Sequence, residues 1–406
     1  MTTRRAFLRS SALGLLIAPW SLRAFAEELG LEPGQVPAGQ TVPFVMDSAP
    51  GAETVINGRK YIYFGGTGYF ALHGNPEMIR VAIDALNTYG MHSATSRTMF
   101  GNNPVLLDAE KKIAGYFQAE DALYFVSGYL SGLFMAQGMA DQFDVAFADE
   151  TAHFSIRDGI FSTRKPVVFY KHRDPSDLRS KLRSELKAGQ RPLVITDGVF
   201  PTFGVIAPVP EIVKELEPYN GILCLDDAHA VGVLGENGRG TCEHFGLKPG
   251  ERLIMSGTLS KAFGGHGGFI PASSAFIKKI KETVGAYSGA SSPPTPIAAA
   301  SAKGIELLQS HPEWREKLRH NVARIKKGLR KLGFDVGDSP FPVVTWALGS
   351  ADEMKRVQKE LLDRGIALPY TKYIGAPAGG VLRASIFSTH TDAHIDHLLD
   401  ELRKLV

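Results

Sequence analysis

The chain has 406 residues, of which 44% are hydrophobic, 21% charged and 9% aromatic. This is the composition of a globular protein, and it excludes a disordered chain and a polytopic membrane protein. The formal charge is only +3 and no dense Lys/Arg cluster occurs, so we expect no nucleic-acid partner. The two cysteines, Cys224 and Cys242, exclude a disulfide-built scaffold, and we expect no metal site. A disulfide between them is not favoured, because Cys224 should be interior.

Residues 1–26 have the pattern of a secretory signal peptide. Arg4 and Arg5 precede a short apolar run at 12–18, and the segment ends in Ala-Phe-Ala26, the small residues that a signal peptidase needs. The arginine pair resembles a bacterial twin-arginine signal. We therefore expect export by the twin-arginine machinery, cleavage after Ala26 and a periplasmic protein without a stable membrane anchor, because the apolar run is too short to span a bilayer. The alternative is an amphipathic helix that stays attached.

Removal of this segment changes the charge argument. It takes away four arginines and no acids, so the formal charge falls from +3 to −1. The basic excess therefore says nothing about partners. The twin-arginine route carries folded proteins, which suits a protein that binds a cofactor before it leaves the cytoplasm.

After the signal, residues 27–70 predict an N-terminal arm that begins with few regular elements. From residue 76, apolar runs of strand length alternate with helical periodicity. This order indicates an α/β fold with a mostly parallel sheet covered on both faces, over residues 71–302. Longer charged helices then predict a smaller α/β domain at 303–406. The predicted helices are 76–87, 105–117, 175–187, 209–217, 303–332, 351–364 and one after Thr391; the predicted strands are 122–126, 145–148, 167–170, 193–196, 222–225, 253–256 and 343–348.

The strongest chemical signal is Lys261, which lies among small residues directly after the predicted strand 253–256. In α/β sheets, ligands bind at the carboxyl ends of the strands. Few charges lie beside this lysine in the sequence, so desolvation should lower the pKa of its amine and free it to form a Schiff base. Taken alone, Lys261 would be better interpreted as a surface loop lysine.

Three further positions strengthen the signal. Asp226 and His229 follow a predicted strand, and a buried carboxylate there needs a partner such as a protonated pyridine nitrogen. The alternative is an aspartate that caps the next turn. His153 follows another predicted strand. Arg383 lies in an otherwise apolar strand of the second domain, where a lone buried arginine should face a carboxylate of the protein or of a substrate.

In this order, these residues resemble the α-oxoamine synthases, pyridoxal-phosphate (PLP) enzymes of fold type I. This family includes 8-amino-7-oxononanoate synthase, glycine C-acetyltransferase, 5-aminolevulinate synthase and serine palmitoyltransferase. The resemblance runs from about Tyr61 to the C-terminus, and implies a large PLP-binding domain, a smaller C-terminal domain and a homodimer with shared active sites. It is most specific at Asp226-Asp-Ala-His229, Gly257-Thr-Leu-Ser-Lys261, Leu382-Arg383 and His390-Thr391.

The resemblance also implies roles for single residues. Lys261 resembles the lysine that holds pyridoxal 5′-phosphate and moves the proton at the substrate Cα. Asp226 resembles the carboxylate that keeps the pyridine nitrogen protonated, His229 the histidine that hydrogen-bonds the ring 3′-oxygen, and His153 the histidine stacked on the ring. Arg383 resembles the clamp on the amino-acid carboxylate. The implied phosphate site comprises Ser127, Gly128, Tyr129, Thr258 and Ser291, the last from the partner subunit.

Departures from the family pattern lie on the substrate side. Thr67, our second candidate for substrate binding, replaces an asparagine that commonly contacts substrate. Pro201-Thr202-Phe203 replaces a hydroxyl and an acid, and the segment 93–97 adds bulk to a glycine-rich stretch. Ala290 stands where the family has a threonine, so Ser291 is expected to take its place.

These features predict a PLP-dependent transferase for a small amino-acid-type substrate. The resemblance implies an external aldimine and a Cα carbanion, which is then C-acylated from a thioester with loss of CO₂. The alternative is an exported aminotransferase that reprotonates the carbanion at the cofactor's C4′, because the family's usual acyl-CoA donor is cytoplasmic. His153 over the ring favours acylation. A non-catalytic binding protein is the third interpretation, which Lys261 together with Asp226 disfavours because a passive binder needs no electron sink.

Overall fold

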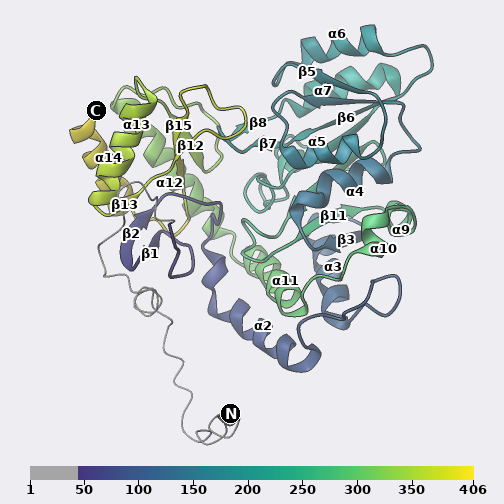
Figure 1. Ribbon diagram of the computed structural model, residues 1–406, viewed down its shortest axis with the longest axis horizontal. Coiled ribbons are helices and arrows are strands. Elements are labelled where there is room, and N and C mark those ends of the chain that lie inside the picture. The colour runs from purple at the N-terminus through teal and green to yellow at the C-terminus, as the bar shows by residue number, and fades with distance from the viewer. Residues whose placement is uncertain (1–43) are drawn as a thin grey trace, which may run out of the picture.

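The computed structural model describes residues 44–406 (Figure 1). The predicted signal peptide at 1–26 and the first part of the predicted arm, 27–43, lie outside the described residues. Within residues 44–406 no helix is both long and apolar enough to cross a membrane. Figure 1 shows a large domain on the right and a smaller domain with the C-terminus on the left.

Among the described residues, seven strands form the central sheet of the large domain in the order β3-β11-β10-β9-β6-β4-β5. All are parallel except β11, which runs antiparallel to both neighbours, so the predicted mostly parallel sheet is confirmed. β11 was not predicted because its sequence, Gly-Phe-Ile-Pro-Ala, contains two residues that disfavour strands. The strands are β3 (Asp121–Phe125), β4 (Val145–Asp149), β5 (Val167–Tyr170), β6 (Pro192–Asp197), β9 (Ile222–Asp226), β10 (Leu253–Thr258) and β11 (Gly268–Ala272).

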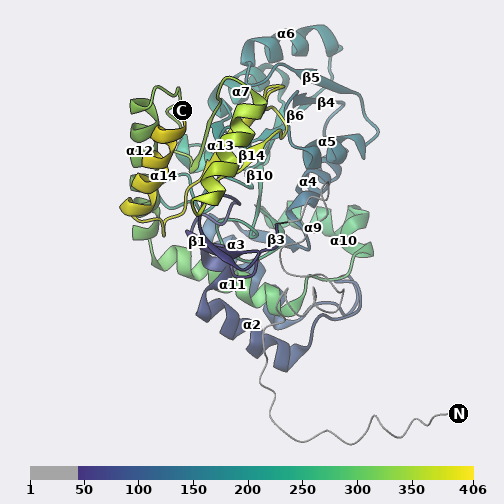
Figure 2. The same ribbon diagram turned by 60° about the vertical axis from the view of Figure 1, so that its left-hand side comes forward.

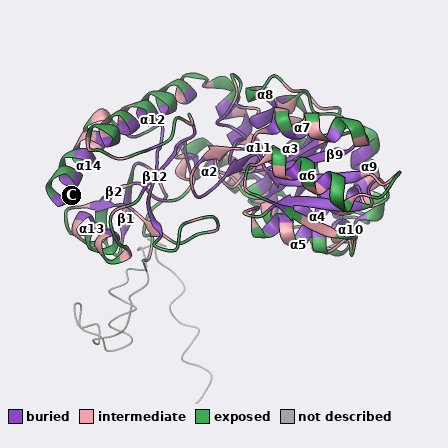
Figure 3. Cartoon of the chain, turned by 90° about the horizontal axis from the view of Figure 1, so that it is seen from above, coloured by how far each residue is buried: buried purple, intermediate pink, exposed green. Residues whose placement is uncertain are grey.

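Helices cover both faces of this sheet, and successive strand residues pack into different clusters. In β9, for example, Leu223 and Leu225 join one hydrophobic cluster, whereas Cys224 joins the other. Cys242 belongs to the first cluster, and both cysteines are free. Figure 3 shows the buried strands between helices whose outer faces are exposed. The helices of this domain are α2 (Pro76–Tyr89), α3 (Pro104–Phe117), α4 (Ser131–Gly138), α5 (Phe154–Phe161), α6 (Pro175–Glu185), α7 (Val209–Leu216), α8 (Thr241–His244), α9 (Ser274–Thr283), α10 (Gly285–Gly289) and α11 (Thr295–Ser310).

Three of these helices begin with the same local device. Asn75, Asn103 and Asp174 each cap a helix by accepting hydrogen bonds from backbone N–H groups of its first turn, and each is followed by proline. The capping side chain satisfies donors that have no partner within the helix, and proline needs no such partner. The helix starts predicted at 76, 105 and 175 therefore agree with the structure to within one residue.

The small domain packs three helices against short strands. A further three-stranded antiparallel sheet in the described chain has the order β12-β15-β14. Figure 2 shows the three helices gathered beside this sheet. The predicted helical stretch 303–332 is divided at Pro312 into α11, which packs on α2 and α3 of the large domain, and α12. The elements are α12 (Glu313–Lys331), β12 (Val343–Trp346), α13 (Ala351–Asp363), β13 (Ile366–Ala367), β14 (Tyr370–Thr371), β15 (Val381–Ser385) and α14 (Asp392–Leu405).

The arm is more regular than predicted. β1 (Glu53–Ile56) and β2 (Arg59–Tyr63) form a hairpin, and β2 pairs in parallel with β13 of the small domain. The connecting Asn57 and Gly58 have φ of 49° and 71°, the left-handed pair that a tight hairpin turn requires. An Asn-Gly pair between alternating residues is the signal that identifies this hairpin.

Candidate active site

The candidate catalytic residues lie at the carboxyl end of the central sheet. Asp226 is the last residue of β9, Asp197 is the last residue of β6, and Lys261 follows the end of β10. A second short hairpin, β7 (Val199–Phe200) and β8 (Val205–Ile206), extends beyond β6. Because parallel strands end at the same edge, residues distant in sequence meet here.

The charged groups at this edge of the sheet shift one another's pKa values. Burial lowers the pKa of Lys261, while the carboxylates of Asp226 and Asp197 oppose that shift. Burial raises the pKa of Asp226, against the opposing charges of Lys261 and His153. Burial and the neighbouring Asp226 raise the pKa of Asp197 well above its usual range. The lowered pKa of Lys261 favours the free amine that carbonyl chemistry needs, as the sequence predicts.

Asp197 was missed by the sequence analysis. Its Oδ2 accepts a hydrogen bond of 2.9 Å from the backbone N–H of His153, so it positions the start of α5. The signal was available, because Asp197, like Asp226, is an acid at the end of an apolar strand. Asp226 itself accepts a hydrogen bond from Ala228 N–H at 3.1 Å, and Ser155 Oγ lies 3.5 Å from its Oδ2.

Both candidate histidines are held through their ring nitrogens. His153 caps α5: its Nδ1 accepts from Ser155 N–H at 3.3 Å, and its Nε2 lies 2.8 Å from Tyr373 Oη. His229 is buried, with Nδ1 3.1 Å from Tyr69 Oη. Burial lowers the pKa of His153, and burial together with Lys261 lowers that of His229 well below its usual range. Both imidazoles are therefore neutral at pH 7.

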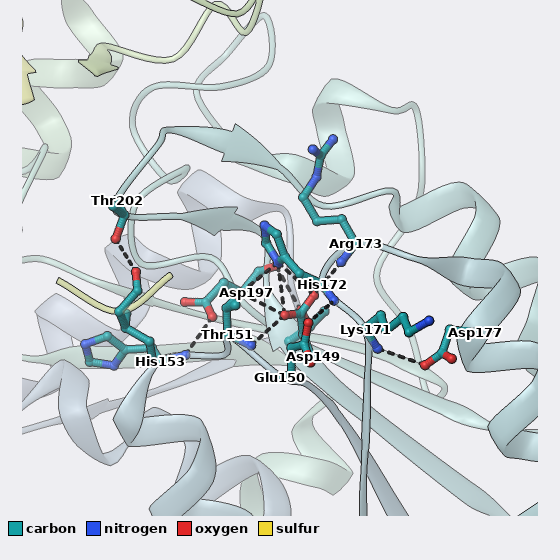
Figure 4. A network of polar contacts seen from close by, with 12 residues as sticks. Asp149, Glu150, Thr151, His153, Lys171, His172, Arg173, Asp177, Asp197 and Thr202 are labelled. Carbon is teal, nitrogen blue, oxygen red and sulfur yellow. Dashed lines mark hydrogen bonds and ion pairs between the residues drawn. The ribbon is translucent and has the colours of Figure 1, made fainter. Parts of the chain in front are cut away.

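A second network fixes the loop behind His153 (Figure 4). The buried Asp149, at the end of β4, accepts hydrogen bonds from the N–H groups of Thr151 and Arg173, both at 2.8 Å, and lies 3.0 Å from His172 Nδ1. Burial opposes ionisation of Asp149, but these hydrogen bonds hold its pKa below the usual value. The turns after β4 and β5 are thereby joined, and the loop that carries His153 is fixed in place.

The predicted phosphate turn meets Thr258. Ser127 Oγ accepts from Tyr129 N–H at 3.3 Å, and the 3₁₀ turn Gly128–Leu130 leads into α4. A Cβ at Gly128 would lie 2.8 Å from Thr258 Oγ1, so glycine alone allows this approach. Backbone N–H groups at a helix N-terminus beside a hydroxyl are suited to a phosphate. Together with Lys261 and a buried carboxylate, these residues fit pyridoxal 5′-phosphate.

Arg383 enters the site from β15 of the small domain. Its Nε donates to Pro201 O at 3.2 Å, and its Nη1 donates to Ser385 Oγ at 2.8 Å and to Gly66 O at 3.5 Å. Within residues 44–406 its hydrogen-bond partners are neutral oxygens, and burial lowers its pKa. Thr67 directly follows Gly66, so it lies close to Arg383.

Ser291 lies elsewhere in the chain. It is exposed and forms a β-bridge with Ser96, on the loop that precedes α11. Its expected contact with the cofactor of a partner subunit stays a prediction, as do the individual roles of the other candidate residues.

Comparisons with known proteins agree with this geometry. The family model for aminotransferase class I and II matches residues 66–402. The chain belongs to that family. The 8-amino-7-oxononanoate synthase 1 of Bacillus subtilis (strain 168) is 34% identical over 360 residues, covering 88% of this chain and 91% of that protein.

Solved structures agree as well. A serine palmitoyltransferase from S. paucimobilis, determined with bound PLP and myriocin, superposes with a TM-score of 0.82 at 26% identity, covering 95% of both chains. The 8-amino-7-oxononanoate synthase of Francisella tularensis superposes with a TM-score of 0.73 at 25% identity, covering 85% of this chain and 97% of that one. The protein is thus a fold type I, PLP-dependent transferase close to the α-oxoamine synthases, which acylate the Cα of an amino substrate with loss of CO₂.

When bound, PLP supplies an electron sink for the electron pair left at Cα. Lys261 would hold the cofactor covalently and then move the Cα proton. Asp226 would pair with the ring nitrogen, His229 would contact the 3′-oxygen, and the Ser127–Tyr129 turn with Thr258 would hold the phosphate.

Proposed function

We propose that this protein is an exported, homodimeric α-oxoamine synthase whose substrate is an α-amino acid held through its carboxylate by Arg383. The observation that carries the proposal is the environment of Arg383. Arg383 lies in the site that contains Lys261, and within residues 44–406 its hydrogen-bond partners are neutral oxygens. Burial lowers the pKa of its guanidinium. A desolvated guanidinium is stabilised by an anion, and its planar fork matches a carboxylate.

The chain's residues can then complete the acylation. Lys261 takes the Cα proton, and the electron pair at Cα attacks the thioester carbonyl carbon. The carbon–sulfur bond breaks and the thiolate leaves with a proton. The bond from Cα to the carboxylate then breaks, CO₂ departs, and Cα regains a proton. One amino acid and one thioester give one amino ketone, one thiol and one CO₂.

The test uses purified holoenzyme, α-amino acids labelled with ¹³C in the carboxyl group, and an acyl-N-acetylcysteamine thioester. The expected result is labelled CO₂ and free thiol in equal amounts, and only when the thioester is present. Release of a keto acid without thiol would contradict acylation and favour transamination. The Arg383→Lys variant keeps the charge but not the fork, and is expected to bind the amino acid more weakly while retaining the cofactor.

The export part of the proposal rests on residues 1–26. It predicts that the protein recovered from the periplasm of its native host begins at Glu27, as N-terminal sequencing would show. A variant with Arg4→Lys and Arg5→Lys together should accumulate inside the cell with its signal attached. Wild-type protein that stays in the cytoplasm and retains Met1 would contradict export.

The homodimer is supported by an exposed apolar surface. Met91, Met99 and Phe100 are 66%, 67% and 86% exposed, and Ile79 and Ile83 of α2 are also exposed. Large apolar side chains exposed on a folded chain are typical of interfaces between subunits. A Phe100→Glu variant is expected to sediment as a monomer and to bind PLP more weakly if Ser291 acts across the interface. Wild-type protein that sediments as a monomer would contradict the dimer.

A further inference from the structure

A loop of the small domain, residues 372–380 between β14 and β15, lies against the large domain at the site. Tyr373 on this loop places its Oη 2.8 Å from His153 Nε2, and its ring meets Phe154 edge-on at 6.2 Å. The neighbouring Ile374 carbonyl accepts a hydrogen bond from Thr202, drawn in Figure 4. Tyr373 is 40% exposed, so it lies at the mouth of the site.

The direction of the Tyr373–His153 hydrogen bond follows from the other side of the imidazole. A backbone N–H can only donate, and Ser155 N–H points at His153 Nδ1, which must therefore carry the lone pair. Ser155 Oγ, 2.7 Å from the same nitrogen, then donates to it as well. Burial lowers the pKa of His153, so the ring is neutral and its single proton lies on Nε2. His153 Nε2 then donates to Tyr373 Oη, and the hydroxyl proton of Tyr373 remains for another acceptor.

That hydroxyl proton stays in place at neutral pH. Burial raises the pKa of Tyr373, and Asp197 raises it further. Within residues 44–406, His153 is the hydrogen-bond partner found for the Tyr373 hydroxyl. The tyrosine is thus oriented by accepting one hydrogen bond and is free to donate a second one.

The position of Tyr373 indicates which substrate group it meets. Arg383, the proposed carboxylate site, lies further inside, between Pro201 and Gly66, and its charge acts on Tyr373. An acyl donor that enters from solvent must pass the mouth. We propose that Tyr373 donates its hydroxyl hydrogen bond to the carbonyl oxygen of the acyl donor as the carbon–carbon bond forms.

This inference rests on the proposed function, because it concerns the acylation step. When Cα attacks the thioester carbon, the carbonyl π electrons move to oxygen, which becomes negative until the thiolate leaves. A fixed donor at that oxygen stabilises the transition state more than the ground state. Lys261 carries out the earlier proton removal from Cα, which needs no acyl donor.

The experiment therefore measures two steps in Tyr373→Phe holoenzyme, which keeps the ring and loses the hydroxyl. The first is exchange of the Cα hydrogen of the amino acid in D₂O without thioester, followed by NMR. The second is thiol release from octanoyl-N-acetylcysteamine. We expect thiol release to fall by roughly 10²–10³-fold, the usual effect of losing one such donor, while exchange changes by less than about threefold.

Tyr370→Phe is the matched control. Tyr370 Oη donates to Gly379 O at 2.7 Å in the same loop, so this variant weakens the loop without touching His153. We expect both of its rates to stay near those of the wild type. Equal losses of exchange and thiol release in Tyr373→Phe would overturn the inference and leave Tyr373 as a residue that only positions His153.

Unchanged thiol release in Tyr373→Phe would overturn the inference while the proposed function stands. If the wild type exchanges the Cα hydrogen but releases no thiol, the proposed function itself fails and the inference fails with it. The two failures are distinguished by the wild-type rate alone.

Discussion

The active site has two sides that are built differently. The cofactor floor, defined as Asp197, Asp226, Thr258 and Lys261, is formed by the ends of strands in a sheet buried on both faces. The substrate rim, defined as Thr67, Thr202, Tyr373 and Arg383, is formed by loops and a small-domain strand. Its hydrogen bonds mostly join the two domains through backbone carbonyls.

This difference separates two properties of the enzyme. The floor is fixed by strand pairing within the large domain, so we expect cofactor binding to depend little on how closely the domains approach. The rim is complete only when the small domain lies against the large one, so substrate binding depends on that approach. Changes to the floor should remove cofactor chemistry, whereas changes to the rim should alter substrate binding and leave the cofactor in place.

The largest effect is expected from Lys261→Ala, on the floor. Loss of the amine removes both the covalent link to the cofactor and the base, so turnover should fall by more than about 10⁴-fold. The measurement is the absorption band of lysine-bound PLP together with thiol release. A folded variant that keeps this band would contradict the assignment of Lys261.

A smaller effect is expected from Arg383→Ala, on the rim. Removing one partner of a desolvated charge pair costs about 3–5 kcal/mol, so KM for the amino acid should rise by roughly 10²–10³-fold or more. The PLP absorption spectrum should match that of the wild type. An unchanged KM would remove the clamp role, and a lost cofactor would contradict the separation of floor and rim.

Gly128→Ala tests the floor at the phosphate turn. The new methyl group would lie 2.8 Å from Thr258 Oγ1, and overpacking of this kind costs about 1–3 kcal/mol. The Kd for PLP, measured by fluorescence titration, should therefore rise by roughly 10–100-fold. Gly115→Ala in α3 is the control, because nothing lies within 4 Å of its added methyl group. Equal Kd values for the two variants would contradict the phosphate site.

The smallest effect is expected on stability, from His390, which contacts the segment 63–64 that leads to the rim. His390 stacks on Phe64 at 4.4 Å, donates from Nε2 to Tyr63 O and accepts at Nδ1 from Phe387 N–H. Burial lowers its pKa to about 3. The unfolded chain, with a histidine pKa of about 6.5, therefore binds the proton first, and stability is lost as pH falls below that value.

Between pH 7 and 5.5 this histidine should account for about 1 kcal/mol of lost unfolding free energy. Urea unfolding of wild type and His390→Gln at both pH values measures it. The variant is expected to be less stable at pH 7 but to lose less on acidification. Equal losses in the two proteins would contradict the neutral, buried state of His390.

The sequence identified Asp226, Thr258 and Lys261 of the floor and Thr67 and Arg383 of the rim, but neither Asp197 nor Tyr373. The strand predicted at 222–225 is Ile222–Asp226, because an apolar run buried on both sides ends where its first acid appears. The same rule would have identified Asp197. Tyr373 gave no local signal, because its partner His153 lies 220 residues away and only the approach of the two domains brings them together.

The proposed reaction is acylation of an amino acid on PLP held by the cofactor floor. The most direct test is the absorption spectrum of purified holoenzyme, titrated with a panel of α-amino acids first without and then with an acyl thioester. The cofactor band is expected to shift with an amino acid, and turnover is expected to begin only when the thioester is added. Conversion of the cofactor to pyridoxamine 5′-phosphate, with a keto acid released before any thioester is present, would contradict it.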